Sequence, residues 1–399
     1  MVATLGAAQT LAWASSYYLP AMLAAPIAHD LGVGVPTVFA AFTLALLVSA
    51  AVGPASGRLI DLRGGRPVLM ATNALFAAGL VALGLAQDRL TLFAAWALLG
   101  LAMGSGLYEA AFATLVRLYH QGARNPITGI TLVAGFASTV GWPLTAWMEA
   151  HFGWRQACFG WAGLHLLLGL PLNAWLPRAA RQQVAPALAA PGLPSVAPAP
   201  DASHGTRTAL LLSFVFATTW FVSTAMAAHL PRLLQAAGAS LAVAVGVGAL
   251  VGPAQVGGRL LEFGVLRKVH PLLSARLAAL AHPLGAVLLL TLGSPVATAF
   301  AVLHGAGNGI LTIAKGTLPL VLFGAAGYGA RQGWMMVPAR VAQAFAPFAF
   351  GVALDRWGAG AVWLSSGLSL SALAALLMLR GARLAAQVPA PPASKALSA

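Results

Sequence analysis

Long apolar runs dominate the chain, and short clusters of charge, proline and glycine separate them. A bilayer core is crossed by about 20 apolar residues in an α-helix, so runs of this length predict membrane-spanning helices. The pattern predicts twelve spans. The first six lie near residues 4–28, 37–59, 67–86, 91–116, 127–148 and 157–176, and the second six near 209–230, 240–260, 271–292, 296–323, 333–354 and 361–380.

Between the two sets lies a segment of different composition. Residues 177–207 are rich in Ala and Pro with scattered charge, and such a segment cannot bury enough apolar area to fold alone. We therefore predict an N-terminal six-helix bundle over residues 1–176, a linker over 177–207, a C-terminal six-helix bundle over 208–383 and a disordered tail over 384–399. Because the amino terminus turns apolar at once, we interpret it as the first span rather than a removed signal.

Composition agrees with this pattern. Of 399 residues, 59% are hydrophobic and 8% are charged, and a soluble domain of that kind would expose large apolar patches. The formal charge of +14 raises the question of a nucleic-acid partner, but the basic residues flank the apolar runs. We expect the lipid bilayer as a partner and no nucleic acid.

Lysine and arginine are divided unevenly between the two sides of the predicted membrane. Sixteen fall on the side that carries both termini and the linker and four on the opposite side, while Lys315 and Arg340 fall within spans. Cytoplasmic loops carry the excess of basic residues in membrane proteins. The count predicts that the termini, the linker and the tail are cytoplasmic, and we expect a multi-pass protein of a bacterial inner (plasma) membrane.

The chain contains an internal repeat. The sequence Gly-Arg-Leu-Ile-Asp at residues 57–61 recurs as Gly-Arg-Leu-Leu-Glu at 258–262, an offset of 201. Further matches follow in the same order at offsets of 205 to 207: Trp13 with Trp220, Ser16 with Ser223, residues 122–124 with 329–331, and Gly104 with Gly309. They indicate two parallel six-helix halves, an architecture that places a substrate site between the halves near the bilayer midplane.

Residues 57–66 read Gly57-Arg58-Leu59-Ile60-Asp61-Leu62-Arg63-Gly64-Gly65-Arg66 and resemble the loop motif between helices 2 and 3 of the major facilitator superfamily. The resemblance implies an all-α membrane fold of twelve helices in two six-helix repeats, and secondary transport by alternating access. It also implies a conformational latch, in which Asp61 caps a helix of the other half and pairs with nearby arginine. The latch residues are Gly57, Asp61, Gly64, Arg66 and, in the second copy, Gly258 and Glu262.

The motif departs from the family pattern, because Leu62 and Gly65 stand at positions where basic residues are usual. We therefore expect fewer charged side chains to take part in the interactions of this motif. Residues 135–143, followed by Gly153-Trp154-Arg155, are more similar to the monocarboxylate and oxalate/formate branches than to the drug antiporters. The alternative for this run is that its small residues allow close helix packing in lipid. The resemblance covers nearly the whole chain but does not specify a substrate.

Glu109 lies well inside the fourth predicted span. An ionised side chain at such a depth costs roughly 2.5 to 3.5 kcal/mol on insertion scales, so its presence calls for a reason. We interpret it as a proton acceptor that changes charge as the site opens and closes. The alternative is a permanently protonated acid that bonds to a neighbouring helix.

The tenth span carries a polar stripe, because His304, Asn308, Thr312 and Lys315 follow at steps of four, four and three residues. Such a stripe is expected to face an aqueous cavity or another helix. The resemblance implies a cavity lined by helices 1, 4, 7 and 10, whose candidate residues are Gln9, Trp13, Ser16, Tyr17, Tyr108, Glu109, Trp220, Ser223, Thr224 and this stripe. Two questions stay open: whether Glu109 and Lys315 form a structural ion pair between the halves, and whether Arg340 snorkels to the surface or reaches the cavity.

The balance of charge within the spans indicates the class of substrate. The spans contain one acidic residue, Glu109, and two basic residues, Lys315 and Arg340. A cavity of net positive charge selects anions. We predict a monomeric transporter, proton-coupled or exchanging, for a small organic anion such as a carboxylate. The rival is efflux of hydrophobic or cationic compounds, with Glu109 binding the cation and the aromatic residues packing it.

An integral membrane enzyme that uses Glu109 and His304 as acid and base is disfavoured, because no nucleophile with a partner base is visible. A passive channel is disfavoured because a two-half repeat suits alternating access. No cofactor or metal is expected: Cys158 is the only cysteine, and His165 and His282 are lone histidines without metal-ligand spacing. Residues 305–309 resemble a phosphate loop but lack the following Lys-Ser/Thr, so close helix packing is the favoured interpretation.

Overall fold

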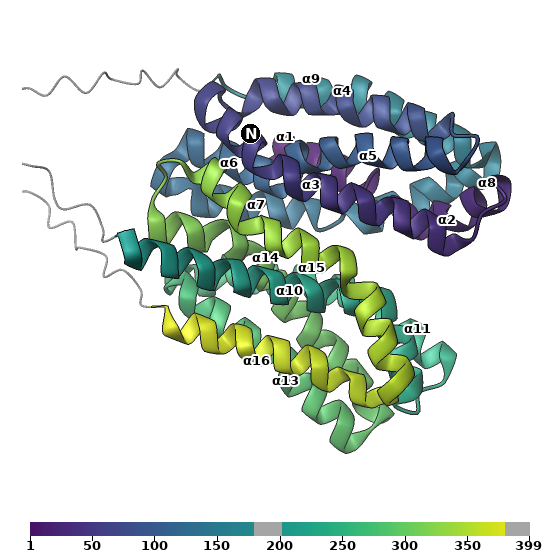
Figure 1. Ribbon diagram of the computed structural model, residues 1–399. Helices are drawn as coiled ribbons and strands as arrows, with labels where there is room; N and C mark the ends of the chain where they lie inside the picture. Colours follow the sequence, from purple (N-terminus) through teal and green to yellow (C-terminus); the bar gives the residue numbers. More distant parts are fainter. Residues whose placement is uncertain (179–201, 380–399) are drawn as a thin grey trace, which may run out of the picture.

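The structure is a computed structural model that describes residues 1–178 and 202–379, and within these ranges it is helical without strands (Figure 1). The tail predicted over 384–399 and most of the predicted linker lie outside the described residues. The longer helices are α3 (Val35–Arg63), α4 (Gly65–Gly84), α8 (Ala137–Leu164), α10 (Ala202–Ala236), α13 (Pro271–Leu292), α14 (Ala297–Phe323) and α15 (Tyr328–Trp357). The shorter ones are α1 (Val2–Ala14), α2 (Leu19–Asp30), α5 (Arg89–Gly106), α6 (Tyr108–Tyr119), α7 (Arg124–Ala134), α9 (Leu170–Ala174), α11 (Leu241–Ala249), α12 (Val251–Gly264) and α16 (Val362–Met378).

Eight helical stretches in the described residues are long and apolar enough to cross a membrane. Arg89–Ala174 reverses direction at η1 (His120–Ala123) and again at Gly153, and Tyr328–Met378 reverses at Gly358. Both glycines have a positive φ, 81° and 53°, which side chains with a Cβ rarely adopt. These stretches therefore contain three and two crossings. With α1 and α2 as the first crossing, the predicted twelve spans are confirmed.

The first span is two helices rather than the one predicted over 4–28. α1 ends at Ala14, α2 begins at Leu19, and the hydroxyl groups of Ser15 and Ser16 bond back to the carbonyl groups of Leu11 and Ala12 at 2.8 and 2.5 Å. Side chains that bond backbone carbonyl groups in this way compete with the helical ladder. The break lies next to two predicted cavity residues, Trp13 and Tyr17.

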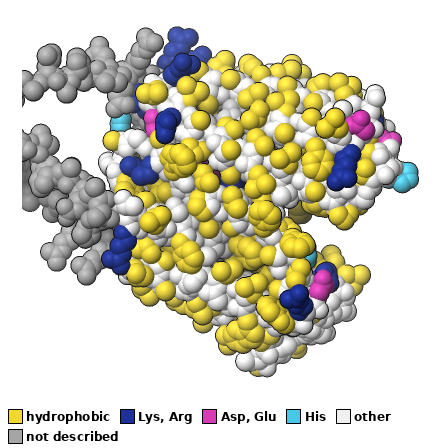
Figure 2. Space-filling view, in the orientation of Figure 1, with side chains coloured by type: hydrophobic (Ala, Val, Ile, Leu, Met, Phe, Trp, Pro, Cys, Tyr) yellow, Lys and Arg dark blue, Asp and Glu magenta, His cyan; other side chains and the backbone are white. Residues whose placement is uncertain are grey.

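The helices form two groups, α1–α9 and α10–α16, which meet closely at one end and separate at the other (Figure 1). We call the closed end the linker side; α1 begins there, α3 ends there and α15 begins there. The other end is called the far side. Figure 2 shows a hollow between the two groups on the far side, and hydrophobic side chains over the lateral face with most charged side chains at the two ends. This distribution is that of a multi-pass membrane protein.

Glycine lets α3 and α15 approach each other and so joins the halves. A Cβ at Gly57 would collide with the backbone of Gly329, and one at Gly333 would lie 2.6 Å from the carbonyl oxygen of Gly53. Small residues are typical of helix contacts in membranes, where close packing replaces the hydrophobic effect. Gly258, the repeat counterpart of Gly57, instead approaches Ala306 of α14 within its own half. The two sequence repeats therefore pack differently.

Two glycine-rich runs singled out in the sequence lie in helix contacts. A Cβ at Gly305 would lie 2.7 Å from the Val251 carbonyl oxygen, and Gly309 approaches Gln255, so this run packs α14 against α12. A Cβ at Gly141 would lie 2.6 Å from the Cβ of Ala14, so the run at 135–143 packs α8 against α1. Both runs have a packing role, as one interpretation of each predicted.

Candidate transport site

An ion pair joins the halves between α6 and α15. Arg340 donates from Nη2 to Oε2 of Glu109 at 2.8 Å and from Nη1 to Oε1 of Gln343 at 3.2 Å. The side chain of Arg340 is 3% exposed and that of Glu109 is 16% exposed. Of the two possibilities left open for Arg340, the structure shows the inward orientation. The partner of Glu109 is Arg340, and the suggested ion pair of Glu109 with Lys315 is wrong for this state.

A break in the fourth span places Glu109 at a helix amino terminus inside the membrane. α5 ends at Gly106, Leu107 is extended (φ −81°, ψ −164°), and Glu109 lies in the first turn of α6. The free N–H groups and the dipole of such a terminus favour a carboxylate. The break also frees the Gly106 carbonyl group, which accepts a 2.7 Å hydrogen bond from Nε2 of Gln9. Gln9 thus stabilises the break that positions Glu109.

Lys315 lies on α14 with its ammonium group over an aromatic ring. Its Nζ is 4.0 Å from the ring centroid of Trp220, and the guanidinium carbon of Arg340 is 5.6 Å from the same ring. Lys315 is only 4% exposed, and no carboxylate of the described residues lies within 4 Å of it. A cation–π contact stabilises a buried ammonium group. Glu109 is close enough to interact with Lys315 electrostatically, but the two side chains form no ion pair in the described ranges.

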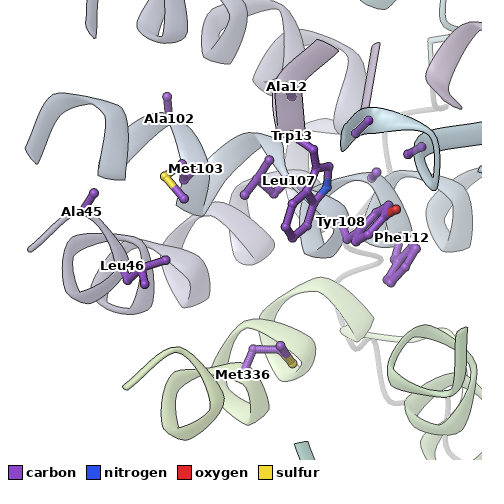
Figure 3. Close-up of a cluster of buried hydrophobic side chains, with 14 of the residues drawn as sticks. Ala12, Trp13, Ala45, Leu46, Ala102, Met103, Leu107, Tyr108, Phe112 and Met336 are labelled. Carbon is purple, nitrogen blue, oxygen red and sulfur yellow. The ribbon is translucent and has the colours of Figure 1, made fainter. Parts of the chain in front are cut away.

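An aromatic cluster lines the contact between the halves. Trp13 and its repeat counterpart Trp220 stack with their centroids 6.2 Å apart and their planes at 7°. Trp13 also contacts Tyr108 at 4.8 Å and Tyr17 at 5.3 Å, and the Tyr17 hydroxyl lies 3.5 Å from Oγ1 of Thr224. Figure 3 shows Trp13 and Tyr108 side by side, facing Met336 of the other half. The Nε1 groups of both tryptophans are buried and have no acceptor among the described residues.

Arg259, one of the sixteen basic residues counted on the side of the termini and the linker, is a buried cation at the same interface. It lies on α12, is 5% exposed, and donates from Nη1 to the Thr131 carbonyl oxygen of α7 at 3.0 Å. Its guanidinium group occupies the space that a Cβ at Gly135 would fill. Arg259 is close enough to Lys315 and Tyr108 to interact with them electrostatically. The one feature of the sequence that could have indicated this buried position is that Arg259 lies in the last turn of the span predicted over 240–260.

The structure divides the predicted stripe of α14 between two places. Lys315 faces Trp220, whereas His304 points to His282 of α13, with their Nδ1 atoms 3.0 Å apart. His282, which has no metal-ligand spacing in the sequence, thus has His304 of the neighbouring helix as a hydrogen-bonding partner. Asn308 donates to Oγ of Ser223 at 3.0 Å, and Thr312 bonds back to the Asn308 carbonyl oxygen at 2.8 Å.

His304, Asn308 and Ser223 line a small pocket with other side chains of α10, α13, α14 and α16 of the second half. The residues that line this pocket all belong to the second half, and the prediction that His304 lines the cavity between the halves stays a prediction. Helical rotation does not separate the two residues: Lys315 follows eleven residues after His304, and at 100° per residue their side chains point only about 20° apart on an ideal helix. They share one face, but different helices cover that face at the two depths.

The motif at residues 57–66 closes the linker side. Asp61 accepts hydrogen bonds from the backbone N–H groups of Gly329 and Ala330 at 2.9 Å each, at the start of α15. Gly64 has a φ of 82° and forms the turn from α3 to α4. No ion pair joins Arg66 to Asp61 in the described ranges, so the structure does not bring these two together.

A second contact on the linker side involves the repeat counterpart of Asp61. Glu262 at the end of α12 accepts a hydrogen bond from Nη2 of Arg124 at 2.9 Å, and Arg124 also donates to the Val269 carbonyl oxygen at 3.0 Å. Each carboxylate thus joins the end of the second span of one half to the start of the fifth span of the other. Both contacts close the end of the molecule opposite the hollow in Figure 2.

A helical membrane protein of two six-helix halves, with buried charges and aromatic residues where the halves meet, has the architecture of a secondary transporter. The sequence profile of the Major Facilitator Superfamily matches residues 5–337, and the chain belongs to this family. The members of this family are transporters, so the enzyme alternative is excluded.

Solved structures of the same fold cover 94% of this chain. The E. coli fucose:proton symporter has a TM-score of 0.72 at 12% identity, with 97% of its chain covered. A proton:xylose symporter bound to a glucose analogue gives 0.71 at 13% identity over 93% of its chain, and the human organic anion transporter MFSD10 gives 0.65 at 17% over 98%. An uncharacterised 38 kDa protein of Thermoproteus tenax is 35% identical over 153 residues, which are 38% of this chain and 40% of that protein.

Proposed function

We propose that this transporter carries a small organic anion, such as a carboxylate, in symport with protons or in exchange. The observation that supports this proposal is the unequal charge where the halves meet. Lys315, Arg340 and Arg259 are buried there against a single carboxylate, Glu109. An excess of buried cations is unfavourable in hydrocarbon unless an anion completes the site.

The contact of Glu109 with Arg340 suggests how the anion binds. A carboxylate substrate offers Arg340 the same oxygen atoms as Glu109 does, and Lys315 and the tryptophan Nε1 groups supply further donors. A substrate that displaces Glu109 leaves this side chain buried without a counter-ion. A buried carboxylate without a partner takes up a proton. Displacement therefore couples anion binding to proton uptake.

The aromatic cluster is the feature that a cation-efflux pump would use, but its geometry supports the anion. The face of Trp220 is already occupied by the ammonium group of Lys315. A cationic drug would have to enter against this charge and that of Arg340. The fold alone does not indicate the class of substrate, because proton symporters of sugars and an organic anion transporter share it.

The orientation in the membrane is part of the proposal. The excess of Lys and Arg on the linker side supports a cytoplasmic location for this side and for both termini, in a bacterial inner membrane. In that orientation, the hollow on the far side opens away from the cytoplasm. The substrate is then received from outside in the state described here.

The test is uptake of a panel of radiolabelled carboxylates by proteoliposomes that contain the purified full chain, with and without a pH gradient. Lys315→Gln is expected to lower uptake of the transported anion by roughly 10- to 100-fold, because a hydrogen bond from a charged donor contributes about 1.5–3 kcal/mol. The matched control is Lys268→Gln, which changes an exposed lysine on the linker side and is expected to leave uptake unchanged. Normal uptake of every tested anion by Lys315→Gln would overturn the proposal.

A further inference from the structure

The second half contains a buried histidine pair that the proposed anion site does not use. His282 of α13 and His304 of α14 are 6% and 4% exposed, with their Nδ1 atoms 3.0 Å apart. Nε2 of His282 lies 2.9 Å from Oγ of Ser365 on α16, and this hydroxyl group donates to the Val362 carbonyl oxygen at 2.9 Å. Three hydrogen bonds therefore run in a chain from His304 to the backbone of α16.

The Val362 carbonyl group at the end of this series of hydrogen bonds determines which atom is the donor in each of them. A carbonyl oxygen only accepts, so Ser365 uses its single proton there and its oxygen accepts from the Nε2–H of His282. The Nδ1 of neutral His282 is then an acceptor, and His304 donates to it from Nδ1–H. A neutral imidazole carries one N–H, so Nε2 of His304 holds a free lone pair.

The side chain that carries this lone pair lines a small polar pocket. Nε2 of His304 has no hydrogen-bond partner in the described part of the chain, and His304 lines the small pocket with Thr219, Ser223, Asn308 and Ser369. These four side chains are polar but do not titrate. Hydroxyl and amide groups around a small space are the partners that an ordered water molecule needs.

No charged group faces the pair from the four helices that line the pocket; on α12, which packs against α14 beside Gly305, the nearest charged residue is Arg259, about 7.5 Å along the helix from Ala254. On α13 and α14 the nearest charged residues are Arg276 and Lys315, about 9 and 16 Å away along the helix axes. On α10 the nearest titratable residue is His229, about 9 Å along the helix from Ser223, and it contacts the Pro347 carbonyl oxygen. α16 has no titratable side chain between Val362 and Met378. The protonation of the pair is therefore set by the pocket itself.

We propose that Nε2 of His304 is a second proton-binding site of this transporter, separate from Glu109; the inference rests on the proposed function. A hydronium ion in the pocket gives its proton to the lone pair and leaves as water, and the only bond formed is N–H. The resulting imidazolium keeps its Nδ1–H bond to His282, so its charge is stabilised by the chain that ends at Val362.

Asn308 connects this site to the anion site. It lies one helical turn after His304 on α14, and its Nδ2 donates to Ser223 of α10. Ser223 lies three residues from Trp220, whose ring holds Lys315. A new N–H on Nε2 attracts the side-chain oxygen of Asn308, and so competes with the bond that joins α14 to α10. Proton binding at His304 thereby alters the packing next to the anion site.

The test is the proton-to-anion stoichiometry, obtained in proteoliposomes from the membrane potential at which net anion flux stops. His304→Asn places an amide N–H where Nδ1–H donates to His282 and removes Nε2. We expect the stoichiometry to fall by one proton per anion and the pH profile of uptake to lose one titration step. Anion exchange at equal pH on both sides, which needs no net proton movement, is expected to stay within about twofold.

His165→Asn is the matched control. His165 is also fully buried, but its ring nitrogens lie 2.7 Å from Oγ of Ser15 and 2.9 Å from Oδ1 of Asn73, so neither faces a pocket. This variant is expected to keep the stoichiometry. An unchanged stoichiometry and pH profile in His304→Asn, with exchange intact, would overturn the proposal.

A second measurement does not depend on transport. In the ¹⁵N NMR spectrum of the purified protein, His304 is expected as the Nδ1–H tautomer at high pH and to gain a proton at Nε2 as the pH falls. An Nε2–H tautomer, or an Nε2 that never titrates while the fold persists, would contradict the inference. Failure of the wild-type protein to transport any anion would count against the proposed function alone, because this spectrum reports on His304 directly.

Discussion

The buried charges of this transporter are stabilised by partners of different strength. Glu109 and Arg340 form an ion pair at 2.8 Å, Lys315 lies over the face of Trp220 without an ion pair, and Arg259 donates to a backbone carbonyl group. A full ion pair compensates both charges, whereas a ring or a carbonyl group compensates a cation only in part. The weakly partnered cations are therefore the ones that gain most when an anion enters.

Glu109→Gln separates the binding role of the anion site from its coupling role. The amide cannot accept a proton, so we expect uptake driven by a pH gradient to be lost while anion exchange continues. Arg340 cannot lose its proton, and removal of its buried partner is expected to lower the stability by about 3–5 kcal/mol, an effect that added substrate anion partly reverses. Uptake with and without a pH gradient, and thermal unfolding with and without the anion, measure both effects.

Glu149→Gln is the control for this change, because Glu149 lies in α8 without an ion pair among the described residues. It is expected to keep the pH dependence of the wild type. If Glu109→Gln also kept it, the coupling role of Glu109 would be wrong.

The sequence identified the buried charges within the predicted spans but not their partners. Glu109 and Lys315 stand out because a charge in an apolar run is costly whatever surrounds it. Whether Glu109 pairs with Lys315 or with Arg340 depends on the rotation of α14 and α15 against α6, which no local pattern encodes. Arg259 was missed for a related reason: next to a helix end, a basic residue that snorkels outward and one that turns inward have the same sequence signature.

At the scale of helices, the sequence predicted where the spans lie but not where they break. The hydropathy of the first and fourth spans is continuous, yet α1 stops at Ala14 and α5 stops at Gly106. These breaks depend on groups from other parts of the chain, such as Gln9, which satisfies the carbonyl group freed at Gly106. Both breaks lie beside the aromatic cluster, where irregular backbone lines a site instead of facing lipid.

The crossing of α3 with α15 supplies a prediction about helices. Gly57→Ala places a methyl group against the backbone of Gly329, which cannot move aside as a side chain can. The two helices are then expected to separate on the linker side, which pulls Asp61 away from the start of α15. The population open on the linker side should rise, and transport should fall by at least about tenfold.

The same helix offers a matched control. A Cβ at Gly53 would come no closer than 3.9 Å to Gly333, an ordinary contact, so Gly53→Ala is expected to transport normally. Distances between spin labels across the linker side report the separation, and buried Cys158 leaves the introduced cysteines as the labelled ones. If Gly57→Ala and Gly53→Ala had equal effects, the close approach of the two helices at Gly57 would not be the cause of the loss of transport.

For the molecule as a whole, charged contacts determine which side is closed. Asp61 and Glu262 each join one half to the other on the linker side. On the far side, Asp30 with Arg155 and Arg232 with Asp355 join helices of the same half, so neither pair resists separation of the halves. The fold class and the two halves could be predicted from the repeat, but the closed side could not, because it depends on these contacts in three dimensions.

Because both linker-side contacts act on one equilibrium between closed and open, their free energies should add. Asp61→Asn loses one of two acceptors at the helix terminus and is expected to favour opening by about 1 kcal/mol, roughly fivefold. Arg124→Ala leaves Glu262 buried and unpaired until opening hydrates it, and is expected to contribute about 3 kcal/mol, roughly 150-fold. The two sites share no partner, so the double variant should shift the equilibrium by the sum, to within about 0.5 kcal/mol.

Spin-label distances across the linker side in lipid nanodiscs give the open fraction of each variant. Asp355→Asn, which changes an exposed pair within one half, is expected to leave this fraction unchanged. A double variant no more open than Arg124→Ala alone would mean that the Asp61 contact forms only when the Glu262 contact is present. The linker side would then close through one cooperative contact instead of two independent ones, and the separate latch role proposed for Asp61 would be wrong.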